Sequence, residues 1–211
     1  MSKYKCVIFD CDGVLVDSEV IGNTVLVEMA NEHGASVDLD YALKHFKGNA
    51  FRNCKAHIED LIHKKLPEDF EKEFRKRSSV AFKKYIKPVE GIMEVVKKLR
   101  IPFCVASSGP ESKIRLNLEI TGLLPYFEAK IFSCFAIGKW KPEPDVFLWA
   151  AETLGFQPKE CLVVEDSLQG VKAALNGGFD VVGYTAHDYR NVLPANATFT
   201  IKHMRELEDL L

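Results

Sequence analysis

The stretch Cys6-Val7-Ile8-Phe9-Asp10-Cys11-Asp12-Gly13 predicts the first strand of the fold and places two acidic residues at its end. The apolar-rich run over residues 6–9 is typical of a strand buried on both faces of a sheet. A short segment such as Asp10 to Gly13 is most often a simple turn, because Asp and Gly suit turn geometry. Neighbouring carboxylates repel each other, however, and a metal ion together with a phosphate group would explain why both are present.

Three further motifs follow in a fixed order along the chain. Their sequences are Phe103-Cys104-Val105-Ala106-Ser107-Ser108-Gly109, Lys139-Trp140-Lys141-Pro142-Glu143-Pro144-Asp145 and Cys161-Leu162-Val163-Val164-Glu165-Asp166-Ser167. The first and the last are apolar runs that end in polar residues, as the run over residues 6–9 does. Ligands bind at the carboxyl ends of the strands in an open α/β sheet. The three runs therefore predict a ligand site at that edge of a sheet.

Most of the chain alternates strand-like and helical patterns, which predicts an α/β fold with a mostly parallel sheet covered on both faces. The expected strands are 5–10, 103–107, 130–132, 161–165, 180–184 and 197–201. The expected helices of this part include 92–100, 111–121, 145–154 and 169–176. Gly122, Gly155 and Gly177 stand where the C-terminal glycines of helices belong.

Residues 18–87 break this alternation, because helical patterns fill them and no convincing strand occurs. The expected helices are 21–33, 41–46, 53–63 and 67–85, and Pro88 and Gly91 mark the return to the α/β pattern. We therefore expect a core made of residues 1–17 and 88–211, with an all-helical domain of residues 18–87 inserted after the first strand.

Taken together, the four motifs resemble those of the haloacid dehalogenase (HAD) superfamily of phosphotransferases, in the family's order and over nearly the whole chain. The subgroup with a helical cap inserted after the first motif is the most similar. It contains phosphosugar phosphatases, 6-phosphogluconate phosphatases among them, and β-phosphoglucomutase. The resemblance implies a Rossmann-like parallel-sheet core and an all-helical cap domain. The segments that carry it most closely are 9–21, 104–113 and 139–144.

The resemblance implies a role for each acidic residue of the first motif. Asp10 is the expected nucleophile, whose carboxylate attacks phosphorus and forms an aspartyl-phosphate. Asp12 is the expected general acid, which protonates the leaving alcohol and then activates water as a base. The dehalogenase branch of the family does not need this second aspartate, so Asp12 favours a phosphatase. Cys11 lies between two acids that raise a thiol pKa, and we expect an inert spacer.

The second and third motifs are expected to bind the phosphate. Ser107 would hydrogen-bond a phosphate oxygen, with Ser108 and Gly109 beside it. Lys141 would bind both the phosphate and the nucleophile, because the proline that follows fixes the backbone there. Lys139 is expected to be solvated. A carboxylate that approaches a phosphate dianion is repelled by about 8 kcal/mol at 4 Å and a dielectric constant near 20, which is why cations are required.

A magnesium site is expected where the first and last motifs meet. Mg²⁺ prefers oxygen ligands and usually keeps several waters, so two or three carboxylates suffice. The expected ligands are Asp10, Asp12 through its backbone carbonyl, Glu165 and Asp166. Glu165 could act directly or through water, and Asp166-Ser167 could cap the following helix as well. Asp17 is an outer candidate near the cap hinge.

Substrate choice is expected to lie in the cap. The resemblance points to Lys47-Gly48 and Arg52 as residues that face the substrate, whereas the charged run Arg75 to Arg77 is better explained as a solvated helix face. β-Phosphoglucomutase carries a catalytic histidine twelve residues after its nucleophile. Gly22 occupies that position here, which disfavours a mutase.

The composition of the chain limits the classes of partner that we expect. A net charge of −2 over 211 residues argues against a nucleic-acid binder that relies on phosphate contacts. No signal peptide, no apolar run of membrane-spanning length and no C-x-x-C zinc motif occur, so we expect a cytoplasmic protein with no membrane partner. The expected oligomeric state is a monomer or a weak homodimer.

The sequence therefore predicts a Mg²⁺-dependent phosphatase that hydrolyses a small phosphorylated sugar or sugar acid, similar to 6-phosphogluconate, through an aspartyl-phosphate. One alternative is a phosphosugar mutase. An alternative of another class is a non-catalytic protein that binds a phosphorylated metabolite, against which the complete set of motif residues argues.

Overall fold

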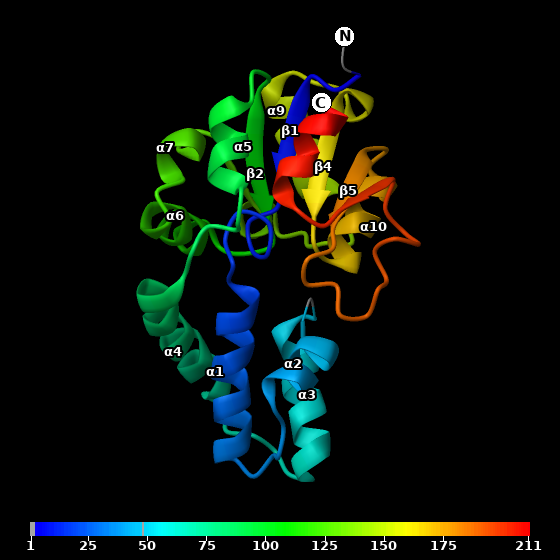
Figure 1. The fold of residues 1–211 in the computed structure, drawn as a ribbon. Coiled ribbons are helices and arrows are strands. Elements are labelled where there is room, and N and C mark those ends of the chain that lie inside the picture. Colours follow the sequence, from blue (N-terminus) through cyan, green and yellow to red (C-terminus); the bar gives the residue numbers. More distant parts are fainter. Residues whose placement is uncertain (1–2, 48) are drawn as a thin grey trace. The chain divides into compact units, whose positions relative to one another are not determined.

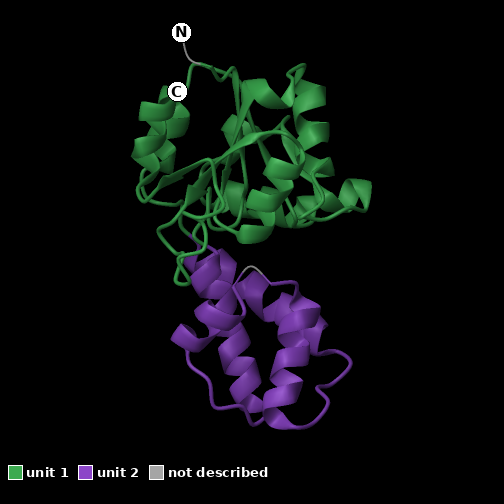
Figure 2. Ribbon diagram, turned by 90° about the vertical axis from the view of Figure 1, so that its right-hand side faces the viewer, with its two compact units in different colours: residues 1–17, 87–211 green, residues 18–86 purple. Residues whose placement is uncertain are grey.

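The computed structural model describes residues 3–47 and 49–211, and the chain divides into two compact units (Figures 1 and 2). The larger unit combines the segment that ends at Asp17 with Lys87–Leu211, and the smaller unit is Ser18–Ile86. The smaller unit thus ends one residue before the expected end of the inserted domain. No helix among the described residues is long and apolar enough to span a membrane.

The larger unit is built on a six-stranded sheet in the order β3-β2-β1-β4-β5-β6, and every described pairing is parallel. The strands are β1 Cys6–Phe9, β2 Phe103–Ser107, β3 Ile131–Ser133, β4 Cys161–Glu165, β5 Asp180–Tyr184 and β6 Phe199–Ile201. The predicted parallel α/β fold is confirmed. The last strand begins two residues later than expected, because the Ala197 amide donates to the Leu193 carbonyl in a turn.

Helices follow most strands of the larger unit, as a parallel sheet requires. They are α5 Ile92–Lys98, α6 Glu111–Ile120, α7 Leu124–Phe127, α8 Cys134–Ile137, α9 Asp145–Leu154 and α10 Leu168–Asn176, with 3₁₀ turns at Pro158–Glu160 and Met204–Leu210. The sequence did not predict α7 or α8, because four residues are too few to show a helical period. Gly177 ends α10 as expected, and the left-handed residue follows it at Gly178.

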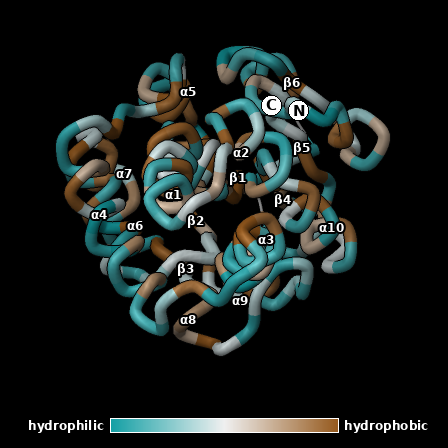
Figure 3. Tube along the Cα trace, turned by 90° about the horizontal axis from the view of Figure 1, so that it is seen from below, coloured by the Kyte–Doolittle hydropathy of each residue, from teal (hydrophilic) through white to brown (hydrophobic). Residues whose placement is uncertain are grey.

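Apolar side chains cover both faces of the sheet. On one face Ile8, Ala106 and Val163 pack with residues of α9 and α10 in a single buried cluster. On the other, the rings of Phe9 and Phe103 lie 6.2 and 5.2 Å from the ring of Phe127 in α7. The helices carry hydrophilic as well as hydrophobic residues along their length (Figure 3), as amphipathic covering helices do. Burial on both faces explains why these strands are continuous apolar runs rather than alternating ones.

The register of the central strands brings the expected site residues together. Phe9 is aligned with Val164 of β4 and with Val105 of β2. The Asp10 amide then donates to the Val164 carbonyl at 2.9 Å. Asp10 therefore leaves the sheet beside Glu165, although 155 residues separate them in the sequence.

All the regular secondary structure among the described residues of the smaller unit is helical. Its helices are α1 Glu19–Glu32, α2 Leu39–His45, α3 Phe51–Ile62 and α4 Phe70–Tyr85. Leu26, Met29, Ile58 and Phe70 contribute to a buried cluster that belongs to this unit alone. Two independent cores explain why the chain can carry a helical insertion without disturbing the sheet.

The two segments that connect the larger unit to the smaller one run side by side. The Asp17 amide donates to the Lys87 carbonyl at 2.9 Å, and the Val89 amide donates to the Leu15 carbonyl at 3.1 Å. These bonds form an antiparallel bridge between Val16 and Pro88. The departure and return points of the inserted unit are therefore held together within the larger unit.

Candidate active site

The loop after β1 folds back sharply and positions the two aspartates. Gly13 has a φ of +81°, and its amide donates to the Val16 carbonyl at 2.8 Å. Cys11 is fully buried between the two acids. Burial is the main cause that raises the pKa of its thiol well above the ordinary value, and the negative charges of Asp12 and Asp10 raise it further. The thiol therefore stays protonated, which agrees with the expected role of Cys11 as a spacer.

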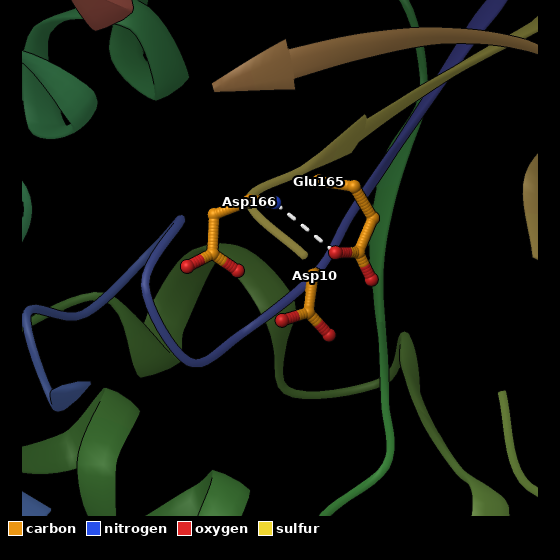
Figure 4. A group of neighbouring side chains, drawn as sticks. All are labelled: Asp10, Glu165 and Asp166. Atoms are coloured by element: carbon orange, nitrogen blue, oxygen red, sulfur yellow. Dashed lines mark hydrogen bonds between the residues drawn. The ribbon is translucent and has the colours of Figure 1, made fainter. Parts of the chain in front are cut away.

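Three buried carboxylates meet at the ends of β1 and β4 (Figure 4). Asp10, Glu165 and Asp166 each offer an oxygen, and these oxygens all lie within 4.8 Å of one another. Burial raises the pKa of Asp10 well above its ordinary value, Lys141 opposes this, and the charges of Glu165 and Asp166 reinforce it. The site thus penalises the ionised form of Asp10, and additional positive charge would relieve that penalty.

Lys141 supplies the cation that the structure itself provides. Its Nζ donates to Asp10 Oδ1 at 2.7 Å, to Glu165 Oε1 at 2.5 Å and to the Ala106 carbonyl at 3.2 Å. Its side chain is 5% exposed. Burial disfavours the ammonium, but the two carboxylates outweigh burial and raise the pKa of Lys141. Lys139, by contrast, is exposed and pairs with Asp145, as expected of a solvated residue.

Glu165 is held by several donors at once. Its Oε2 accepts hydrogen bonds from the backbone amides of Asp166 and Ser167 and from the Ser167 hydroxyl, at 2.9 to 3.1 Å. Ser167 also caps α10 by accepting from the Gly170 amide. A Cβ on Gly170 would lie 1.8 Å from Glu165 Oε1, so only glycine fits there. In this geometry Glu165 orients Lys141. The cap expected at Asp166-Ser167 is made by Ser167, whereas the hydrogen bonds from Ser167 to Glu165 and the contribution of Gly170 were not predicted from the sequence.

The loop after β2 is fixed by two serine hydroxyls. Ser107 is buried, and its Oγ accepts from the Gly109 amide at 3.1 Å. Ser133, at the end of β3, donates to the Gly109 carbonyl at 2.7 Å. Ser108 is exposed. Ser133 was not among the residues expected from the sequence, because a serine that ends a three-residue strand carries no motif of its own.

A second lysine pairs with the second aspartate. Lys113 Nζ lies 2.8 Å from Asp12 Oδ2, and both side chains are partly buried. The sequence reasoning assigned no role to Lys113. A signal was present, because a cation in the first turn of a helix opposes the positive end of the helix dipole.

The acidic cluster fits a divalent metal ion. Its donors are all carboxylate oxygens, which Mg²⁺ and Ca²⁺ prefer. A Cβ on Gly13 would lie 2.2 Å from Asp166 Oδ2, so the glycine keeps the backbone of the β1 loop close against this carboxylate. Asp12 is not part of the cluster, because its carboxylate is paired with Lys113. Its expected contribution through the backbone carbonyl stays a prediction.

Comparisons with known proteins place the chain in a family. A family model described as haloacid dehalogenase-like hydrolase matches residues 4–178. The 6-phosphogluconate phosphatase of Escherichia coli strain K12 is 34% identical over 214 aligned residues, which cover 100% of this chain and 96% of the relative.

Two solved structures are similar over nearly their whole length. A conserved haloacid dehalogenase-like protein from Agrobacterium tumefaciens has a TM-score of 0.91 and 30% identity, over 98% of this chain and 97% of that chain. A HAD family hydrolase from Deinococcus radiodurans, with bound phosphate and sodium, has a TM-score of 0.83 and 29% identity, over 98% and 94%.

The chain therefore belongs to the haloacid dehalogenase-like hydrolases. The family and the enzyme class predicted from the motifs, a phosphatase of this family, are both confirmed. The individual roles of the site residues remain predictions.

The cap residues expected to face the substrate lie in the smaller unit. Lys47 follows α2, and Arg52 is exposed in the first turn of α3. Gly48 lies outside the described residues. Asp17, the outer candidate, lies 3.8 Å from the ring of His187 and away from the carboxylate cluster.

The Gly13 contact generates a first prediction. Substitution Gly13→Ala would drive a methyl group into the Asp166 carboxylate, so we expect a loss of activity of about 100-fold, the cost of displacing a positioned group by about 1 Å. The Mg²⁺ concentration for half-maximal activity should also rise. Both are measured by phosphate release from p-nitrophenyl phosphate during a metal titration.

Gly155→Ala is the matched control. Gly155 has nearly the same left-handed backbone, with a φ of +80°, but a Cβ there would meet nothing within 4 Å. Both variants should lose about 1–2 kcal/mol of stability from backbone strain. Only Gly13→Ala should lose activity and metal affinity. Equal activities in the two variants would show that the close contact between Gly13 and Asp166 does not contribute to activity.

Proposed function

We propose that this protein is a Mg²⁺-dependent phosphatase that hydrolyses a small phosphorylated sugar or sugar acid through an aspartyl-phosphate intermediate. The observation that carries the proposal is the buried carboxylate of Asp10, held at 2.7 Å by the buried ammonium of Lys141 beside two further acids. Such a group has no evident structural use, because replacing buried charges by apolar residues is often neutral or stabilising.

In the first step Asp10 is the nucleophile. Lys141 holds Oδ1, so Oδ2 is the oxygen that forms the bond to phosphorus. The bond between phosphorus and the ester oxygen breaks, and Asp12 gives its proton to the departing alcohol. Ser107 and the amide of Ser108 would hydrogen-bond the phosphate oxygens from the neighbouring strand end, where the loop is fixed by Ser133.

In the second step the aspartyl-phosphate is hydrolysed. Asp12, now ionised, takes a proton from a water molecule as that water attacks phosphorus. The bond between phosphorus and Asp10 breaks, which restores the free carboxylate and releases inorganic phosphate. Two moderate barriers replace one high barrier, which is the general advantage of covalent catalysis.

Charge balance supports the metal. Asp10, Asp12, Glu165 and Asp166 bring four carboxylates to this edge of the sheet, and Lys141 and Lys113 bring two ammonium groups. With all four carboxylates ionised, before Asp12 takes up the proton that it later gives to the leaving alcohol, the excess of two negative charges is the charge that one divalent cation balances. We propose that Asp10 and Asp166 hold Mg²⁺ with the Asp12 carbonyl, and that Glu165 acts through Lys141 or a bridging water. When bound, Mg²⁺ would neutralise charge on the phosphate.

The substrate class rests on the relatives and on the smaller unit. The E. coli relative is named for 6-phosphogluconate, a phosphate ester with a carboxylate at its far end. Lys47 and Arg52 are the cations that we propose to contact such an end. We further propose that the protein works in the cytoplasm on a soluble metabolite, as a monomer or a weak homodimer.

A phosphosugar mutase is the nearest alternative. It would need a catalytic acid and base in the cap. Gly22 occupies the expected histidine position in α1, where a Cβ would lie 3.8 Å from the ring of Phe82. Identification of the product distinguishes the two activities, because a phosphatase releases inorganic phosphate and a mutase returns an isomeric sugar phosphate.

Removal of the nucleophile tests the mechanism. Asp10→Asn should lower the rate of phosphate release from 6-phosphogluconate by at least about 1,000-fold, which corresponds to about 4 kcal/mol in the barrier. Its stability should not fall. The raised pKa of Asp10 means that the ionised carboxylate destabilises the metal-free fold above that pKa, so a neutral amide is tolerated. A variant within tenfold of the wild-type rate would exclude Asp10 as the nucleophile.

Metal removal tests the cofactor separately. EDTA should abolish phosphate release, and an excess of Mg²⁺ should restore it, because two uncompensated negative charges otherwise oppose the binding of phosphate. EDTA should leave the unfolding temperature of the substrate-free protein nearly unchanged or slightly lower. Removing the ion takes away only the stabilisation that ion binding gives to the folded state. Full turnover in metal-free buffer would refute the proposed site.

Substitution in the smaller unit tests the substrate class. Lys47→Ala with Arg52→Ala should reduce kcat/KM for 6-phosphogluconate by about 10–100-fold, the weight of a charge-assisted hydrogen bond. The loss for p-nitrophenyl phosphate, which lacks a second anionic end, should be small. Arg75→Ala with Lys76→Ala removes two exposed cations of α4 as a control. Similar losses on both substrates would remove Lys47 and Arg52 from the specificity site.

A further inference from the structure

Lys113 makes the second ion pair of the site, and the steps of the proposed reaction give it no role beyond its charge. The residue lies in the first turn of α6, and its Nζ is 2.8 Å from Asp12 Oδ2. The side chains of Lys113 and Asp12 are 33% and 21% exposed, so the pair is partly shielded from water. An ion pair with this geometry restricts the carboxylate far more than a fully solvated surface pair does.

Three side chains converge over one glycine. A Cβ built on Gly109 would lie 3.6 Å from Ser107 Oγ, 3.7 Å from Lys113 Cδ and 3.8 Å from Asp12 Oδ2. The stem of Lys113 therefore passes over the phosphate-binding loop before its ammonium reaches Asp12. This path places Lys113 at the reacting groups, although it belongs to none of the four motifs.

The position of Lys113 is unfavourable for the helix that carries it. A cation in the first turn opposes the positive end of the helix dipole, where acidic residues are preferred. Glu111 fills that preference in the same turn and pairs with Arg115. The helix itself thus gains nothing from a lysine at position 113, and the pairing with Asp12 is the interaction that explains it.

The two lysines divide the carboxylates between them. Lys141 holds Asp10 and Glu165, whereas Lys113 holds Asp12. The ion pair with Lys113 restrains the χ1 and χ2 angles of the Asp12 side chain. With it, Oδ2 is fixed as an acceptor, and the proton exchanged during the reaction is carried by Oδ1.

We infer that Lys113 is a positioning residue that acts through Asp12 and aligns its carboxylate with the leaving oxygen of the substrate. This inference rests on the proposed function of Asp12 as the general acid. It does not require Lys113 to touch the substrate. Direct binding of an anionic group of the substrate by Lys113 is the competing interpretation, and the experiment below distinguishes the two.

The test uses Lys113→Met and three substrates. They are 6-phosphogluconate, glucitol 6-phosphate and p-nitrophenyl phosphate. Glucitol 6-phosphate has a similar length to 6-phosphogluconate but carries an uncharged hydroxyl group in place of the carboxylate. The value of kcat/KM reports on steps up to the departure of the leaving group. An alkoxide needs a proton from Asp12 as it leaves, whereas nitrophenolate leaves without one. The dependence on the leaving group therefore isolates the acid, which a general loss of structure would not do.

Lys113→Met should lower kcat/KM for both sugar-derived phosphates by a similar factor of about 10–100, part of the 10²–10⁴ that a positioned acid contributes. For p-nitrophenyl phosphate the change should stay within about threefold. Arg115→Met is the matched control, because Arg115 lies in the same helix and pairs only with exposed groups of the larger unit. It should leave all three values unchanged.

A double substitution tests whether Lys113 acts through Asp12. In an Asp12→Asn background the acid is absent, so Lys113→Met should cause no further loss for glucitol 6-phosphate. Independent, multiplicative losses would overturn the inference. A loss confined to 6-phosphogluconate would also overturn it and assign Lys113 to direct anion binding, and equal losses on all three substrates would assign it a structural role.

The wild-type protein separates this inference from the proposed function. If the wild type releases no phosphate from any of the three substrates, the proposed function itself fails, and the role of Lys113 fails with it. If the wild type is active and Lys113→Met is indistinguishable from it, only the inference about Lys113 is refuted.

Discussion

The buried ammonium of Lys141 is the interaction on which the site depends. It reaches Asp10 after β1, the Ala106 carbonyl in β2 and Glu165 at the end of β4. Removing the lysine would leave two buried carboxylates without their cation, and loss of one partner of a buried ion pair typically costs about 3–5 kcal/mol when the remaining charge is uncompensated. The arrangement is therefore cooperative: both carboxylates are tolerated because the lysine is present, and Glu165 still compensates the lysine where Asp10 is neutral.

The parallel sheet makes this meeting possible. Strands that run the same way end at the same edge, and the order β2-β1-β4 places the three central ends next to one another. Two glycines let main-chain atoms pack directly against the carboxylates. Gly13 lies against Asp166 and Gly170 lies against Glu165, and a Cβ at either position would overlap with the carboxylate. The carboxylates thus lie against the main chain of the β1 loop and of the first turn of α10.

The division of the chain into two units separates two tasks. All described members of the acidic cluster and both paired lysines belong to the larger unit, whose sheet fixes them. The smaller unit has its own core and is joined through a pair of hydrogen-bonded segments. If the larger unit carries out the reaction and the smaller unit selects the substrate, the range of substrates could change while the reacting groups stay in place.

The sequence by itself determined the family, the parallel α/β class and the order of the strands along the chain, because local patterns carry them. Continuous apolar runs mark strands buried on both faces, and acids at the end of such a run mark the ligand edge. The resemblance already implied that Lys141 contacts Asp10, and only the tertiary structure decided the other pairings of acids with cations. Glu165 contacts Lys141, Asp12 contacts Lys113, and Ser133 fixes a loop 24 residues away. Contacts between residues this far apart depend on strand register and loop conformation, and no local pattern encodes them.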